Sequence, residues 1–189
     1  GIVTDSLVLK HNYAAGGVTP VSDGAAYFNV DNTDYIQLPN AFDHNNITVS
    51  AWIYIDADTS TTKTIFSNRQ ADDEGMLFYI SSSENLIIKV EGTNGSGTAV
   101  PLNKWTHVAG TWDGSTMKGY VDGVLGSSDS KSGTMTAGGS NARIGADAHS
   151  DRYWWPGYIS NVGVWSAALT QPQIKSIMWK NYAGLTSSE

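Results

Sequence analysis

The stretch Trp-Thr-His-Val-Ala-Gly-Thr-Trp-Asp-Gly-Ser, residues 105–115, continues into Tyr-Val-Asp-Gly at residues 120–123 and predicts short strands joined by tight turns. The pairs Asp113-Gly114 and Asp122-Gly123 stand at the two ends of the second strand, and glycine after aspartate supplies the positive φ that tight turns require. We therefore expect antiparallel strands here, at the centre of the fold.

Further segments rich in β-branched and aromatic residues follow at intervals of about ten residues, which is the spacing of a two-sheet sandwich. In residues 47–55 both the odd-numbered and the even-numbered positions, which point to opposite faces of a strand, carry apolar side chains. This strand is therefore expected to be central and covered on both faces. We expect Trp52, Trp112 and Trp165 in the core, and one helix from a cap at Thr170 to about Tyr182. The other predicted strands comprise residues 25–30, 35–39, 64–67, 76–80, 86–90, 142–145 and 157–165.

The amino-acid composition argues against several classes of function. The chain has 189 residues, 18 acidic and 11 basic side chains and a net charge of −7, which disfavours binding to nucleic acid. It has no apolar run long enough to insert into a membrane. The absence of cysteine excludes disulfides and thiol chemistry. The aromatic share of 11% leaves aromatic side chains available for surfaces as well as for the core.

The motifs of the central stretch, Trp, His-Val-Ala, Thr-Trp-Asp-Gly and Tyr-Val-Asp-Gly, resemble those of laminin G-like and pentraxin-like domains of the concanavalin A-like lectin/glucanase superfamily. Residues 157–165, Gly-Tyr-Ile-Ser-Asn-Val-Gly-Val-Trp, are similar to the closing strand of these domains. The resemblance implies an all-β, two-sheet antiparallel jelly-roll sandwich with a short C-terminal helix. We divide the chain into an N-terminal arm or edge strand, residues 1–22, and a single jelly roll, residues 23–189.

The resemblance also implies a calcium site. Pentraxins bind ligands through calcium held by two acidic loops, and the corresponding acids here are Asp72 and Asp73 in one loop and Asp147 and Asp151 in the other. Calcium takes about six to eight oxygen ligands from carboxylates, amides and carbonyls, which such loops supply when they meet. The alternative is that these carboxylates only face water, keep their loops hydrated and bind no ion.

A second calcium set comprises Asp31, Asp34 and Asn161. Several relatives have aspartate where Asn161 stands and use it to hold a structural calcium ion. An amide oxygen also ligates but carries no charge, and Asp and Asn in turns often cap their own backbone.

Three large aromatic residues, Tyr153, Trp154 and Trp155, directly follow the second acidic loop. Flat aromatic faces stack on the C–H surfaces of sugars. We predict that these rings, with His149 of the same loop, bind the ligand. The alternative is a hydrophobic plug that closes one end of the sandwich.

Hydrolysis of a glycosidic bond requires a pair of carboxylates, which jelly-roll glucanases supply in the motif Glu-x-Asp-x-x-Glu. The chain has four glutamates, Glu74, Glu84, Glu91 and Glu189, and none begins this motif. The sequence therefore argues against an enzyme.

The preferred function is a non-catalytic, calcium-assisted, lectin-like module, located extracellularly or on a virion surface. Its expected partner is a carbohydrate or another cell-surface ligand, and assembly into a homo-oligomer is left open. The alternative is a structural, attachment or decoration domain that binds protein, and a glycoside hydrolase comes third.

Overall fold

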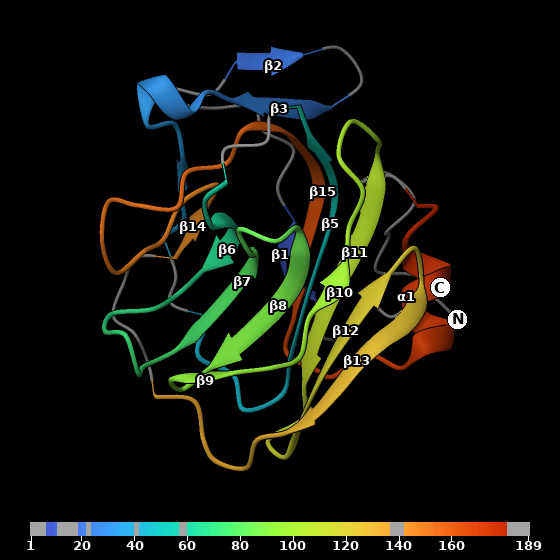
Figure 1. The fold of residues 1–189 in the computed structure, drawn as a ribbon. Coiled ribbons are helices and arrows are strands. Elements are labelled where there is room, and N and C mark those ends of the chain that lie inside the picture. Colours follow the sequence, from blue (N-terminus) through green and yellow to red (C-terminus); the bar gives the residue numbers. More distant parts are fainter. Residues whose placement is uncertain are drawn as a thin grey trace.

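The computed structural model describes residues 7–10, 19–21, 24–39, 42–56, 60–136 and 142–180. In these residues two antiparallel sheets pack face to face, with one short helix near the C-terminus (Figure 1). The predicted all-β sandwich is confirmed.

The first sheet has the strand order β13-β12-β11-β5-β15-β3-β2, with β1 beside the other half of β15. Its strands are β1 (Leu7–Lys10), β2 (Thr19–Val21), β3 (Ala25–Phe28), β5 (Ile47–Ile55), β11 (Thr106–Trp112), β12 (Thr116–Val121), β13 (Val124–Ser130) and β15 (Gly157–Trp165).

The second sheet has the order β10-β8-β7-β6-β14-β4, with β9 paired to β8. Its strands are β4 (Ile36–Gln37), β6 (Lys63–Ser67), β7 (Met76–Ile80), β8 (Asn85–Val90), β9 (Thr93–Asn94), β10 (Thr98–Ala99) and β14 (Arg143–Ile144). A 3₁₀ turn, η1 (Val30–Asn32), follows β3, and the helix α1 (Gln171–Ile177) follows β15.

The central hairpin forms as the sequence predicts. Strands β11 and β12 pair from Val108 opposite Val121 to Trp112 opposite Met117. The carboxylate of Asp113 accepts hydrogen bonds from the backbone N–H groups of the next turn. At the following turn Asp122 and Gly123 both have positive φ, 48° and 72°, as a two-residue hairpin loop requires.

The main core lies between the sheets and follows the alternation of the strands. Strand β5 sits between β11 and β15, and its residues Val49, Ala51, Ile53 and Ile55 are buried against the second sheet. Trp112 is fully buried in this core. The prediction that β5 is central is confirmed.

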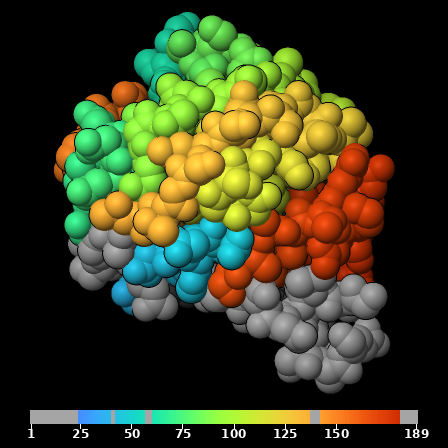
Figure 2. All heavy atoms as spheres, turned by 90° about the horizontal axis from the view of Figure 1, so that it is seen from below, coloured from blue at the N-terminus to red at the C-terminus, as the bar shows by residue number. Residues whose placement is uncertain are grey.

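A smaller apolar cluster lies on the outer face of the first sheet, beneath α1. Trp165 of β15 packs there with Ile174 and Ile177 of the helix. Figure 2 shows α1 beside the β12–β13 hairpin, where the side-chain amide of Gln171 donates to the Gly123 carbonyl at 2.9 Å. Trp165 is therefore buried, as predicted, in a cluster that the helix forms with Ala109 of β11 and Tyr120 of β12.

Two expectations need correction. Trp52 lies half-buried on the outer face of the first sheet, because it belongs to the alternating set opposite the core residues of β5, and its indole N–H donates to the Met178 carbonyl at 2.8 Å. The helix ends at Ile177 and not near Tyr182, which lies outside the described residues. None of the helices in the described ranges has the length and apolar character that a membrane crossing needs.

Replacing Trp112 with alanine should lower the free energy of unfolding by about 3–5 kcal/mol, because the indole leaves a cavity in a close-packed core. The matched variant Trp179→Ala should cost less than about 1.5 kcal/mol, since the Trp179 side chain is exposed and only stacks on Trp52. Urea unfolding measures both. Equal losses would contradict the core assignment of Trp112.

His107 in β11 should make stability depend on pH. Burial, opposed only in part by the charge of Asp122, lowers the pKa of His107 from 6.5 to about 4, and Nδ1 of His107 has no hydrogen-bond partner in the described structure. The unfolded chain takes up the proton at higher pH, so the free energy of unfolding should fall as the pH drops from 6.5 toward 4, by about 3 kcal/mol in total. Urea unfolding across this pH range should show a slope that His107→Gln reduces, and an unchanged slope would contradict the assignment.

Candidate functional site

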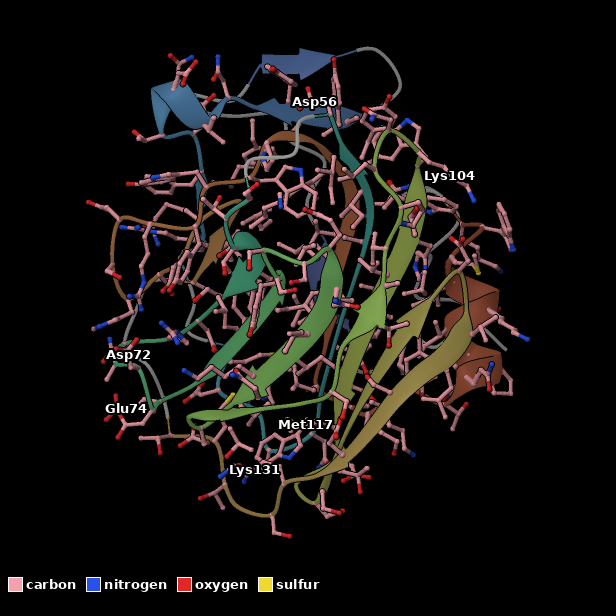
Figure 3. The ribbon with its side chains drawn as sticks, viewed as in Figure 1. Asp56, Asp72, Glu74, Lys104, Met117 and Lys131 are labelled. Carbon is pink, nitrogen blue, oxygen red and sulfur yellow. The ribbon has the colours of Figure 1, made fainter. Side chains whose placement is uncertain are left out.

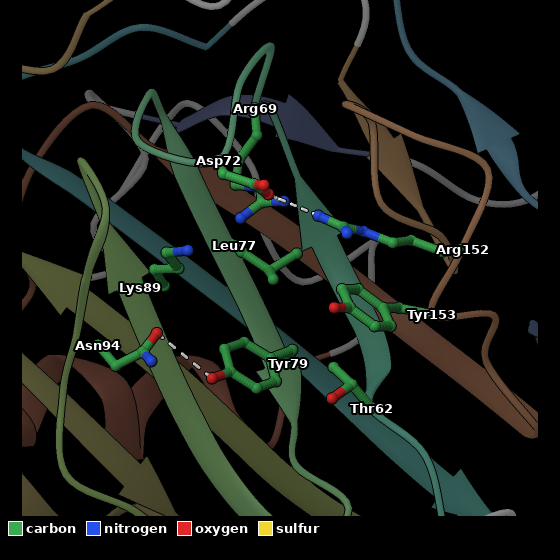
Figure 4. A pocket seen from close by; sticks show the side chains of 9 residues that line it. All are labelled: Thr62, Arg69, Asp72, Leu77, Tyr79, Lys89, Asn94, Arg152 and Tyr153. Atoms are coloured by element: carbon green, nitrogen blue, oxygen red, sulfur yellow. Dashed lines mark hydrogen bonds and ion pairs between the residues drawn. The ribbon is translucent and has the colours of Figure 1, made fainter.

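A pocket lies on the outer face of the second sheet, over β7 and β8 (Figure 4). In β7 the side chains of Met76, Phe78 and Ile80 enter the core, so the alternate residues Leu77 and Tyr79 face outward. The pocket has a volume of about 350 Å³ and is lined by Thr62, Arg69, Asp72, Leu77, Tyr79, Lys89, Asn94, Arg152 and Tyr153.

The loop between β14 and β15 forms one wall of this pocket. Trp155 is fully buried in the main core, and its backbone N–H donates to the Gly145 carbonyl at 2.9 Å. The carbonyl of Tyr153 accepts from the N–H of Thr64 in β6 at 2.8 Å, which fixes the loop to the sheet. Tyr153 has a φ of 60°, and this left-handed turn brings its ring to the pocket while Trp155 enters the core.

Four charged side chains, Arg69, Asp72, Asp147 and Arg152, form an arginine–aspartate cluster. Figure 4 shows Arg69, Asp72 and Arg152 at the upper end of the pocket. Asp147 is fully buried and accepts from Nη2 of Arg69 at 2.7 Å and from Nε of Arg152 at 3.1 Å. Asp72 is largely exposed and accepts from the same two arginines, at 3.1 and 2.6 Å. Ser67 of β6 donates a further hydrogen bond to Asp147. The cluster ties the loop after β6 to the loop before β15.

The cluster is electrically balanced, with two guanidinium groups and two carboxylates. The hydrogen bond from Arg152, and then the charges of Arg152 and Arg69, hold the pKa of Asp72 below its usual value despite some desolvation. Lys89, on β8, lines the same pocket, and it forms no ion pair with any described residue. Desolvation, and then repulsion by Arg69, lowers the pKa of Lys89.

The structure brings the two predicted acidic loops together, and ion pairs with arginines join them. Asp73 is exposed, and Asp151 pairs with Arg143 at 2.9 Å. Exposed His149 contacts the Gln70 carbonyl through Nδ1, and its backbone N–H donates to Asp147 at 3.3 Å. In the described parts of the chain, no three His, Cys, Asp or Glu side chains gather as a metal-binding group. Calcium binding by these loops stays a prediction.

The second calcium set is not brought together. Strand β3 pairs with β15 from Ala25 opposite Ser160 to Phe28 opposite Gly157. Asn161 therefore lies beyond Ala25, at the N-terminal end of β3. Asp31 and Asp34 follow Phe28, at the C-terminal end of the same strand. Asp34 instead accepts a hydrogen bond from the backbone N–H of Asn29, which caps η1.

The three aromatic residues of the loop have three different positions. Tyr153 lines the pocket, and its role in ligand binding stays a prediction. Trp154 is half-buried and pairs with the ring of Tyr35, at 6.1 Å between centroids, outside the pocket lining. The assignment of Trp155 to ligand binding is wrong, because its ring is fully buried and fills the core as the plug alternative predicts.

The sequence interpretation missed most of the pocket lining, including Arg69, Tyr79, Lys89 and Arg152. The alternation of β7 and β8 contained a usable signal, since it places Tyr79 and Lys89 on the face opposite Phe78 and Ile88. It gave no sign that two arginines would span the acidic loops, because that contact depends on how the loops fold.

A row of aromatic rings on the outer face of the first sheet was also missed. Tyr158 of β15 stands opposite Tyr27 on one side and Tyr54 on the other, with ring centroids 4.9 and 5.9 Å away. Trp105, the first residue of the central stretch, continues the row at 5.8 Å from Tyr54 and is 39% exposed.

Comparison with known proteins gives one family and several structures. A family model described as the concanavalin A-like lectin/glucanases superfamily matches residues 30–175. Domain 4 of AbnA, an extracellular GH43 arabinanase from Geobacillus stearothermophilus solved with arabinotriose, is 21% identical, with a TM-score of 0.64 over 86% of this chain and 82% of that one. A search of curated protein sequences gave no significant match.

Two further structures share the fold. The binding domain of botulinum neurotoxin DC, in complex with SialylT, is 15% identical with a TM-score of 0.70; the match covers 98% of this chain but only 53% of the toxin domain. A heptameric SAP-like pentraxin from Limulus polyphemus is 22% identical with a TM-score of 0.59, over 76% of this chain and 74% of that one. At these identities the structures support the fold alone, and they confirm the resemblance to pentraxin-like domains.

Replacing Asp147 with asparagine should lower the free energy of unfolding by about 3–5 kcal/mol, because the buried guanidinium of Arg69 loses its buried charge partner and keeps only the exposed carboxylate of Asp72. The matched variant Asp151→Asn breaks only an exposed ion pair and should cost at most about 1 kcal/mol. Thermal and urea unfolding compare the two. Similar losses would show that Asp147 merely solvates its loop.

Proposed function

Because the chain belongs to the concanavalin A-like lectin/glucanases superfamily, we propose that it is a non-catalytic carbohydrate-binding module whose pocket over β7 and β8 holds the sugar. The observation that carries the proposal is the pocket itself, which combines aromatic side chains with polar groups on a rigid sheet. Its volume of about 350 Å³ lies at the small end of ligand pockets and suits the end of a glycan.

The lining offers the two kinds of contact that sugars use. The ring of Tyr153 lies at one side of the pocket (Figure 4), and the guanidinium of Arg152 lies over one of its faces at 4.6 Å from the centroid. We propose that the rest of the ring contacts the apolar face of a sugar. The hydroxyl of Tyr79 lies 3.4 Å from the side-chain oxygen of Asn94, so polar atoms for sugar hydroxyls stand at the floor.

The arginine–aspartate cluster supports the proposal, because it orders the pocket wall before a ligand arrives. Asp72 marks the outer edge of the molecule in Figure 3, and its contacts with both arginines join the two loops that border the pocket. A wall that is already ordered loses less conformational entropy on binding, which improves affinity.

The charges in the pocket favour binding over catalysis. Glycoside hydrolysis needs a general acid with a raised pKa and a second carboxylate nearby. Asp72 is the sole carboxylate among the described residues that line the pocket, and its pKa is lowered. Asp147, behind the lining, is engaged by two arginines.

Related folds support a glycan ligand and an exposed location. The arabinanase domain was solved with arabinotriose and the toxin binding domain with SialylT. We propose an extracellular or surface location for this chain as well, with a virion surface as one form of it. Calcium assistance remains part of the proposal to be tested, with one condition: an ion at Asp147 would have to displace the guanidinium groups of Arg69 and Arg152.

The aromatic row on the first sheet favours a second candidate function, attachment to protein. Tyr27, Tyr158, Tyr54 and Trp105 form a continuous band across four neighbouring strands or strand ends, and aromatic side chains are enriched in protein interfaces. A second copy of the chain is one partner that such a face would suit.

A glycan array, run with calcium and with a chelator, tests the proposal. Tyr153→Ala should weaken binding by about 1–3 kcal/mol, or roughly 5- to 150-fold, by analogy with base stacking on aromatic rings, with little change in melting temperature. Trp105→Ala, directly before β11 of the other sheet, is the matched control and should leave glycan binding unchanged.

An array without any bound glycan would overturn the proposal, as would binding that Trp105→Ala removes and Tyr153→Ala does not. Loss of binding in the chelator would support calcium assistance, and equal binding in both buffers would remove calcium from the proposal.

A further inference from the structure

We propose that the pocket selects sugars that carry a negatively charged substituent, a carboxylate or a sulfate, and that the ammonium group of Lys89 pairs with it. This inference rests on the proposed carbohydrate function and specifies its ligand class.

The charge balance of the lining leaves Lys89 as the surplus cation. Three cations line the pocket, Arg69, Arg152 and Lys89. Both arginines are paired with the carboxylates of Asp72 and Asp147, which together supply two negative charges. Lys89 has no ion pair within the described residues. In a chain with a net charge of −7, an unpaired lysine inside a concave surface is a feature that points to an anionic ligand.

The position of Lys89 suits a ligand that already contacts Tyr153. Lys89 lies opposite Leu77 in the β7–β8 pairing, so both side chains stand on the outer face of the sheet. In Figure 4 Lys89 and Tyr153 occupy opposite sides of the pocket, and the ammonium group is directed toward the side where Arg69 and Asp72 lie. A sugar ring against Tyr153 would therefore project a substituent across the pocket toward Lys89.

Electrostatics favour an anion at this point. Desolvation and the positive charges of Arg69 and Arg152 lower the pKa of Lys89, whereas Asp72 and Asp147 raise it, and the lowering effects prevail. The ammonium group thus stands in a partly desolvated place beside a balanced cluster, with no carboxylate of its own among the described residues. An incoming anion would give it a charge partner, and the partial desolvation of the pocket would strengthen the pair relative to one in open solvent.

The test is an array of matched glycans in which each neutral sugar is accompanied by its sialylated, uronic acid and sulfated counterparts. For the wild-type chain at low salt we expect the anionic member of a pair to bind at least about tenfold more tightly, as a charge-assisted hydrogen bond allows. The sialylated, uronic acid and sulfated arms identify which anionic group the pocket prefers. The preference should shrink as sodium chloride is raised, because salt screens a partly exposed ion pair.

Two lysine substitutions and one control make the test specific. Lys89→Gln should abolish the preference while the neutral sugar binds as before, and Lys89→Arg should retain it. Lys118→Gln, on β12 of the other sheet, should change neither value. Melting temperatures check folding; if Lys89→Gln is unfolded, the salt dependence of the wild-type preference and the Lys89→Arg result decide.

Each failure has a distinct meaning. Equal binding of neutral and anionic members, with loss of both in Tyr153→Ala, would overturn the anionic preference and leave the carbohydrate function intact. A preference that survives in Lys89→Gln would overturn the role of Lys89. An array without binding would overturn the proposed function and this inference together.

Discussion

The carboxylate of Asp147 is fully buried between the guanidinium groups of Arg69 and Arg152, and the pocket wall depends on this contact. Removing the charge of Asp147 is costly, because the buried guanidinium of Arg69 then stays out of water with only exposed Asp72 to balance it. The loop after β6 and the loop before β15 are therefore held together at a fixed distance. Since Tyr153 follows Arg152 directly, the same contact determines where the aromatic side of the pocket stands.

The period-two geometry of β7 and β8 explains how one strand pair serves both the core and the pocket. Phe78 and Ile88 face the first sheet, while Leu77, Tyr79 and Lys89 face outward on the same backbone. A shift of register by one residue would exchange the two sets, so the core residues fix the orientation of the pocket residues. The core residues and the pocket residues thus lie on opposite faces of the same strands, and the backbone links the packing of one set to the position of the other.

The sequence predicts much of this fold because its turns and alternation are local. Asp113-Gly114 and Asp122-Gly123 mark hairpin turns by chemistry that needs no tertiary context, and both form. The prediction that Trp52 lies in the core is wrong because residues 47–55 carry apolar side chains on both faces of the strand. Such a pattern does not show which face packs against the second sheet. The outer face of this strand is covered by the end of the helix, to which Trp52 donates a hydrogen bond.

The candidate site was less predictable, because its chemistry depends on contacts between loops. The sequence brought Asp72 and Asp147 into one hypothesis, and they do approach each other, but the cations between them are arginines from the same two loops. Neighbouring Tyr153 and Trp155 look equivalent in sequence. They differ in the structure because Tyr153 adopts a positive φ. This conformation is uncommon for residues other than glycine, so the sequence does not predict it.

The separation of the paired arginines from Lys89 has a consequence for how this pocket could diversify. Arg69 and Arg152 are committed to holding two loops, so their replacement would alter the shape of the wall and the stability of the fold together. Lys89 and Tyr153 carry no such structural ion pairs in the described chain. Changes at these two positions can alter the charge and the stacking surface of the pocket while the arginine–aspartate cluster keeps its geometry. Under the proposed function, ligand preference would therefore rest on side chains outside the arginine–aspartate cluster.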